Sequence, residues 1–281
     1  ADATTDDTTS QTFDGNSDLQ PDWMWFKSRS VVGNHGWMDT SRGKGGGTSF
    51  KTLFMSTADE RTSSSGYDLT SMNSDGFSYG RPNQLDWAHN APANNVVWAW
   101  KVNGGTTTSF SESGSNPGGA RQVNTTAGIS IITYTGTGSN GTVAHGLGAI
   151  PNLVIVKNRD GGTNDSFFSH WTNLPGTLGN DHVLYFNGTD GSVSNASGFN
   201  STAPTSTNVT IGTNSATNTD GDNYVMYCIT NIKGYSKVGR YKSNNNADGP
   251  YIYTGFRPAF ILAKMDSSDG TSWRVYDHKR D

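Results

Sequence analysis

The sequence predicts an all-β protein built from tandem antiparallel β-sandwich or jelly-roll-like modules with long loops. Three observations support this class: the chain is poor in helix formers, its apolar runs are short, and those runs recur. Gly occupies 35 of 281 positions, Thr, Ser and Asn are similarly frequent, and only 16% of residues are charged. A helical bundle would need Ala, Leu, Glu and Lys in quantity, so that class is excluded. The two best helical windows, residues 56–61 and 82–88, are short.

Three heptads that begin with Pro and end with Lys mark the start of each repeated unit. They are residues 21–27 (PDWMWFK), 151–157 (PNLVIVK) and 258–264 (PAFILAK). Each apolar run is short, aromatic or β-branched, and opened by Pro where a missing N–H costs least, which predicts a strand. The near-continuous apolarity predicts that the strand is covered on both faces.

A second, aromatic strand is expected after a polar turn in every unit, at residues 36–39, 166–171 and 272–277. More strands are expected in the first two units alone, where residues 51–55 match 182–186, residues 76–80 match 208–212, and residues 95–100 match 223–228. A strand that introduces the unit is expected at residues 134–136 and 251–255, with a weaker copy at residues 11–15.

The repeat predicts three segments along the chain. Residues 1–112 form a first β module with an N-terminal extension and linker, residues 113–236 a second module, and residues 237–281 the start of a third, truncated module. The unit starts lie roughly 100 residues or more apart, which is too long for a solenoid and fits tandem sandwiches or barrels. The polar segments 106–122 and 237–248 are expected to be linkers or long surface loops.

Charge, hydropathy and cysteine content restrict the partners. The net charge is −4 and the pI about 5.8, so no global basic field attracts nucleic acid or an anionic membrane. No apolar stretch approaches the roughly 18 residues that span a bilayer, and membrane insertion is not expected. The one cysteine, Cys228, lies in an alternating apolar run and is expected to be a buried filler.

Residue types that bind metals or catalyse reactions do not cluster in the sequence. The six His never stand at i, i+2 or i, i+4, so neither a metal site nor a cofactor is predicted. His145 ends a strand at a Gly-flanked turn, where its ring is expected to bond a backbone group. No local carboxylate pair and no nucleophile motif occurs, so no catalytic residue is predicted and the chain is expected not to be an enzyme.

An Asp-x-x-Arg spacing follows the second strand in two of the units. It joins Asp39 to Arg42 and Asp277 to Arg280. The two alternatives are a pair that positions a sugar and a solvated ion pair that contributes little, and the second is favoured.

The chain has eight Trp, which serve either as core fillers or as platforms for sugar rings. Trp23 and Trp25 share one face of a strand by period two, as do Trp98 and Trp100, and core positions are favoured for these four. The residues predicted to contact a glycan or a partner are Trp87, Tyr79 and Trp171, of which Trp87 in a loop-like stretch is the strongest candidate.

Several longer phrases carry a family resemblance. They are residues 151–160 (PNLVIVKNRD), 134–139 (YTGTGS) with 145–148 (HGLG), 202–206 (TAPTS), 234–239 (GYSKVG), 248–258 (DGPYIYTGFRP) and 273–280 (WRVYDHKR). As a set they resemble a repeat family of tail-fibre-like and other virion structural proteins of marine bacteriophages, over nearly the whole chain. The resemblance implies a β-rich, non-enzymatic part of a virion surface and supplies no catalytic or ligand residues.

The functional expectation is therefore a structural protein at the surface of a bacteriophage virion, in a tail fibre or appendage or as a capsid decoration. Its expected partners are other virion proteins, further copies of itself in a homo-oligomer such as a trimer, and a host surface glycan. The main alternative is a carbohydrate-binding adhesin module that uses exposed aromatics. A third alternative, a polysaccharide-degrading enzyme, requires two carboxylates that face each other across a groove.

Overall fold

The computed structural model describes residues 8–13, 15, 17–29, 35–45, 47, 49–54, 60, 69–80, 94–161, 168–171 and 179–279. Within this part of the chain the protein is almost entirely β, and every strand pair is antiparallel. The helix α1 (Ser215–Asn218) is a single turn capped by Asn214. The predicted all-β class is confirmed.

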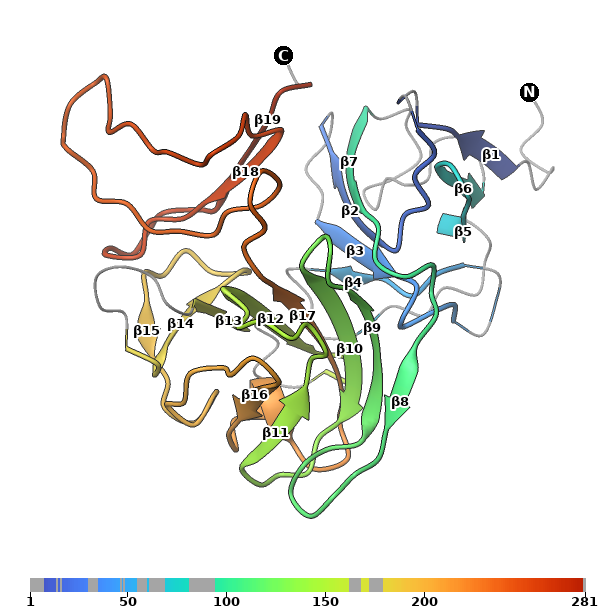
Figure 1. The fold of residues 1–281 in the computed structure, drawn as a ribbon, viewed down its shortest axis with the longest axis vertical. Coiled ribbons are helices and arrows are strands. Elements are labelled where there is room, and N and C mark those ends of the chain that lie inside the picture. The colour runs from blue at the N-terminus through green and yellow to red at the C-terminus, as the bar shows by residue number, and fades with distance from the viewer. Residues whose placement is uncertain are drawn as a thin grey trace.

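The strands form two large sheets and three small ones (Figure 1). The four-stranded sheet has the order β4 (Leu53–Phe54), β3 (Gly36–Asp39), β2 (Trp23–Ser28), β7 (Asn95–Trp100). The eight-stranded sheet has the order β15 (Val193–Ser194), β14 (His182–Tyr185), β13 (Phe168–Trp171), β12 (Leu153–Asn158), β17 (Asn223–Ile229), β10 (Ile129–Thr135), β9 (Gly119–Asn124), β8 (Thr108–Phe110). The small sheets are β1 (Thr8–Gln11), β6 (Phe77–Gly80) and β5 (Leu69–Met72); β11 (Gly141–Ala144) and β16 (Asn208–Ile211); and the hairpin β18 (Phe260–Ala263) and β19 (Arg274–Asp277).

The sequence repeat is a structural repeat with one register. The strand after each Pro is β2, β12 or β18, and the third residue of its heptad pairs with the last residue of the following strand. These pairs are Trp23 with Asp39, Leu153 with Trp171, and Phe260 with Asp277. The strand order β4-β3-β2-β7 reappears in the second unit as β14-β13-β12-β17.

One strand correspondence predicted from the sequence is wrong by one residue. The sequence match aligned Asn95 with Asn223, but the heptad lysines pair with Val96 in β7 and with Val225 in β17. Asn95 therefore corresponds to Tyr224. Because side chains alternate between faces along a strand, this shift decides which aromatics face the core.

The third and fifth residues of all three heptads point into one shared core. It contains Trp23 and Trp25 from β2, Leu153 and Ile155 from β12, and Phe260 and Leu262 from β18, together with Trp37, Trp98, Val225, Tyr227 and Phe186. Trp23 connects the two large sheets, since its ring stacks on Trp100 at 4.4 Å and on Tyr227 at 4.8 Å. The three units are therefore arranged around a common aromatic centre.

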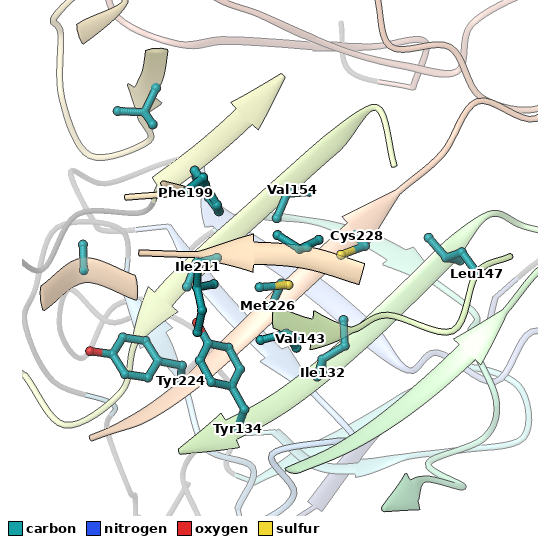
Figure 2. Packing of buried hydrophobic residues seen from close by; sticks show 14 residues of the cluster. Ile132, Tyr134, Val143, Leu147, Val154, Phe199, Ile211, Tyr224, Met226 and Cys228 are labelled. Atoms are coloured by element: carbon teal, nitrogen blue, oxygen red, sulfur yellow. The ribbon is translucent and has the colours of Figure 1, made fainter. Parts of the chain in front are cut away.

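The fourth and sixth residues of the first two heptads point the other way, into separate outer cores. Met24 and Phe26 pack against residues of β5 and β6. Val154 and Val156 pack against residues of β11 and β16 (Figure 2). The prediction of strands covered on both faces is confirmed for these two units.

Three predicted segments differ from the structure. Residues 106–122, expected to be a linker or loop, contain β8 and the start of β9, two strands at one edge of the eight-stranded sheet. Residues 11–15, expected to introduce the first unit, begin at the end of β1, which pairs with β6 in an outer sheet and not with β7. Residues 251–255 form no strand, although their counterpart in the second unit lies at the end of β10. The three module boundaries remain predictions.

Candidate interaction surface

The Asp39–Arg42 pair is buried, which corrects the prediction of a solvated surface pair. Both side chains are inaccessible to solvent, and the Arg42 guanidinium also donates to the carbonyl of Trp37 at 2.9 Å and to Glu60 Oε1 at 2.9 Å. Glu60 in turn accepts from Arg159 of the second unit at 3.1 and 2.8 Å. The four side chains form one ion network between the two large sheets.

The pKa values in this network follow from burial and charge. Burial alone disfavours the charged Arg42 guanidinium, but Asp39, Tyr227 and Glu60 outweigh it and raise the pKa of Arg42. Burial alone likewise raises the pKa of the Glu60 carboxyl, but Arg42 and Arg159 outweigh it and lower that pKa. Arg42 and Glu60 are therefore both held in their charged forms and are paired within the protein, as expected of a structural network.

Tyr227 extends the network into the shared core. Its hydroxyl donates to Asp39 Oδ2 at 2.7 Å, so a residue of β17 bonds to the last residue of β3. Burial is the largest cause that raises the pKa of Tyr227 well above its usual value, although Arg42 opposes it. The phenol remains a neutral donor.

A second polar connection joins the first unit to β9. The Asp22 carboxylate accepts from the amides of Val102 at 2.6 Å and Gly104 at 3.0 Å and from Thr40 Oγ1 at 3.0 Å. Gln122 of β9 donates to the same Thr40 hydroxyl at 2.7 Å. These bonds fix the chain where it passes from β7 toward β8.

The third unit is anchored to both large sheets. Asp277, in the position of Asp39, accepts from Trp98 Nε1 at 3.2 Å. Trp273 Nε1 donates to the carbonyl of Tyr185 at 2.8 Å, and its ring stacks on Phe186 at 4.3 Å. Arg280, the second half of the predicted pair, lies outside the described residues.

The aromatic predictions divide into three outcomes. Trp23, Trp25 and Trp98 are buried and Trp100 packs against the same cluster, so the core prediction is confirmed. Tyr79 of β6 is half-buried and packs against an outer core. Trp87 and the side chain of Trp171 lie outside what the structure describes, so their predicted glycan contact stays a prediction.

His145 and Cys228 have the structural roles expected of them. The His145 ring bonds the carbonyl of Thr205 through Nε2 at 3.1 Å and accepts from the amide of Leu147 through Nδ1 at 3.2 Å. Burial is the main cause that lowers the pKa of His145. Cys228 is a buried free thiol whose pKa is raised by burial.

Among the described residues, no group of three or more His, Cys, Asp or Glu side chains is placed to hold a metal ion.

Exposed apolar side chains gather in the C-terminal part of the chain. Tyr251 and Tyr253 are 90% and 74% exposed, and Ile261 and Tyr276 are 46% and 50% exposed. Met265, which follows β18 in the chain, is also exposed. We call these five residues the C-terminal surface. Sequence reasoning placed the exposed aromatics elsewhere because it could not show that residues 251–255 lack a neighbouring strand.

Comparison with known proteins adds a family to this description. A family model described as a domain of unknown function, DUF7483, matches residues 3–281. The chain belongs to the DUF7483 family. The DUF7483 match spans all three Pro heptads, so the units around the shared core belong to one family domain. No curated protein and no solved structure gives a significant match.

The described part of the chain contains no helix of the length and apolarity that crossing a bilayer requires.

Proposed function

We propose that this chain is a non-enzymatic structural protein on the surface of a bacteriophage virion, in a tail fibre or appendage or as a capsid decoration. It acts by assembly with other virion proteins and with copies of itself, and by host attachment. The observation that carries the proposal is the arrangement of three β units around one aromatic core, with charges paired between units and apolar side chains turned outward at the C-terminal surface. The resemblance of the repeat phrases to virion proteins supports it.

The physical properties of the molecule suit this role. A virion protein folds once and then has to persist outside a cell, which favours slow unfolding. The stack of Trp23 on Tyr227 and a buried ion network connect the two large sheets, so neither sheet opens without loss of contacts to the other. Assembly with other chains also covers sheet edges that would otherwise pair with unrelated proteins.

Immunogold electron microscopy of purified particles tests the proposal. An antibody against this chain is expected to label one defined location on the particle surface, and peptides of the chain are expected in the mass spectrum of the same particles. Particles that lack the protein would contradict the proposal.

A carbohydrate-binding adhesin is a second candidate, favoured by the exposure of Tyr251 and Tyr253. Flat aromatic faces stack on sugar rings, and these two tyrosines are the most exposed large hydrophobic side chains of the described residues. A glycan array tests it: Tyr251→Ala is expected to lose a glycan that the unmodified protein retains, whereas Tyr241→Ala, at another exposed position, keeps it. Retention of no glycan by the unmodified protein would rule the candidate out.

A further inference from the structure

We propose that Asn187 is a site of spontaneous deamidation, and that its conversion to isoaspartate loosens the β18–β19 hairpin from the second unit. Water is the only co-reactant, and neither an enzyme nor an oxidant takes part. The inference goes beyond the proposed assembly function and does not depend on it.

The chemistry belongs to Asn-Gly pairs. The glycine N–H gives up its proton to solvent base, its nitrogen attacks Cγ of the asparagine, and the side-chain nitrogen takes up a proton and leaves as ammonia. Water then opens the five-membered imide at either carbonyl, which gives aspartate or isoaspartate. Glycine favours ring closure because it has no Cβ and a wide range of backbone angles.

The sequence contains three such pairs, which the structure places in different surroundings. They begin at Asn103, Asn140 and Asn187. In the first pair both reacting groups are engaged. The amide of Gly104 donates to the Asp22 carboxylate at 3.0 Å, and Asn103 Nδ2 donates to the carbonyl of Thr106 at 3.0 Å. Both bonds have to open before the ring can close.

The second pair is held by a strand. Asn140 is exposed, but Gly141 is the first residue of β11 and pairs with Ile211 of β16. A Cβ at Gly141 would lie 2.1 Å from the carbonyl oxygen of Ser115, so the backbone is enclosed by two neighbouring segments. Ring closure requires the Asn140–Gly141 peptide to rotate, which these neighbours oppose.

The third pair is free to react. Asn187 is exposed in the turn after β14, and its side chain has no hydrogen bond to another described residue. The amide of Gly188 donates to the carbonyl of Tyr185 at 3.4 Å, which is long for an N–H···O bond. Neither the attacking nitrogen nor the leaving amide is held firmly.

Asn187 and Gly188 lie between two anchors of the hairpin. On one side, the buried Phe186 ring stacks on Trp273 at 4.3 Å. On the other side, the carbonyl of Thr189 accepts from Lys264 Nζ at 3.1 Å and from the amide of Thr271 at 3.2 Å. The reactive pair is therefore part of the contact between the second unit and the hairpin.

Two further bonds continue the same contact along the chain. The amide of Gly191 donates to Asp269 Oδ1 at 2.8 Å, and the amide of Ser192 donates to the carbonyl of Asp266 at 2.7 Å. Isoaspartate at position 187 adds one carbon atom to the main chain between Phe186 and these acceptors and donors. The aromatic anchor and the polar bonds then no longer fit together, so the hairpin opens more readily.

Incubation of the intact protein in mildly alkaline buffer, followed by peptide mass spectrometry, tests the site. Asn187 is expected to deamidate about tenfold faster than Asn103 or Asn140, whose surroundings have to open locally first. Asn187→Gln is the matched control, because it keeps the amide but would have to close a six-membered ring, which is much slower. Labelling by a protein isoaspartate methyltransferase is expected in the unmodified protein and not in the control.

Hydrogen exchange of Phe260–Ala263 tests the consequence. After incubation these amides are expected to exchange about tenfold faster in the unmodified protein, while exchange in β12 stays unchanged. Incubated Asn187→Gln is expected to keep the exchange rates of fresh protein at both places.

Three results would overturn the inference. The first is a lack of isoaspartate at Asn187. The second is deamidation of Asn103 or Asn140 at the rate of Asn187. The third is hairpin exchange that isoaspartate leaves unchanged, or that accelerates equally in incubated Asn187→Gln. None of them bears on the presence of the protein in virions, so the two proposals fail separately.

Discussion

Arg42 shows at the scale of one residue how the two large sheets depend on each other. Its guanidinium contacts Asp39 of its own unit and Glu60, which in turn binds Arg159 of the next unit. Burial removes these charges from water, so the folded protein is stable only if each buried charge keeps its partner. The sequence showed the Asp-x-x-Arg spacing but not Glu60 or Arg159, because those partners come from distant parts of the chain.

Replacement of Arg42 tests the network directly. Arg42→Met is expected to lower the free energy of unfolding by about 3–5 kcal/mol, since it leaves buried carboxylates without a partner. Chemical denaturation measures the change. Arg240→Met is the control, because Arg240 binds Asp266 where both side chains are partly exposed, and a change below about 1 kcal/mol is expected there. Equal effects of the two substitutions would contradict the assigned role.

His145 makes stability depend on pH. Burial lowers its pKa in the folded state, so below about pH 6.5 the unfolded chain binds a proton that the folded protein resists. Its contribution to stability is therefore complete at pH 7 and above, and falls as the pH decreases from about 6.5 toward the folded pKa. When the free energy of unfolding is measured between pH 8 and pH 5, it is expected to change less steeply with pH in His145→Gln than in the unmodified protein. An identical slope in both proteins would show that His145 does not titrate in this way.

Trp273 is the anchor at the scale of the β18–β19 hairpin. Trp273→Ala removes the stacking on Phe186 and the bond to Tyr185, and is expected to reduce the free energy of local opening by about 2 kcal/mol. Hydrogen exchange of Phe260–Ala263 should then accelerate more than exchange in β12. Tyr276→Ala, on the outward face of the same hairpin, is expected to leave exchange unchanged in the isolated protein. Equal acceleration across the eight-stranded sheet after Trp273→Ala would argue against a separately anchored hairpin.

The strands also show how much of the fold can be predicted from sequence. The Pro heptads contain four or five consecutive apolar or aromatic residues before the Lys, and they predict β2, β12 and β18 because so short an apolar run is typical of a buried strand. β8 and β9 were missed because both are polar strands that bury little apolar surface; β8 forms the edge of the sheet, and β9 lies between β8 and β10. The sequence alignment of β7 with β17 was wrong by one residue, because similar residues in two strands do not specify which residue of the neighbouring strand each one pairs with.

At the scale of the whole molecule, the sequence predicted repetition but not its geometry. Tandem modules were expected to be separate sandwiches, each with its own core. The structure gives each of the first two units an outer core and makes all three share the central one. The alternation of apolar residues shows which faces of a strand are buried, but it does not show whether a face packs against its own unit or against another one. The shared core could therefore not be predicted from the sequence. The candidate surface was missed for the same reason, since exposure depends on which strands are present nearby.

The shared core is the central claim, and the chain contains a separate probe of each large sheet. Five of the eight Trp lie in β2, β3 and β7 and report on the first unit by fluorescence. Cys228, the one thiol, is buried in the outer core of the second unit and becomes reactive only when that unit opens. Pulsed thiol labelling and tryptophan fluorescence should therefore give the same denaturation midpoint, because one core holds both units in a single cooperative transition. Two clearly separated denaturation midpoints would contradict the claim that the two units share one core.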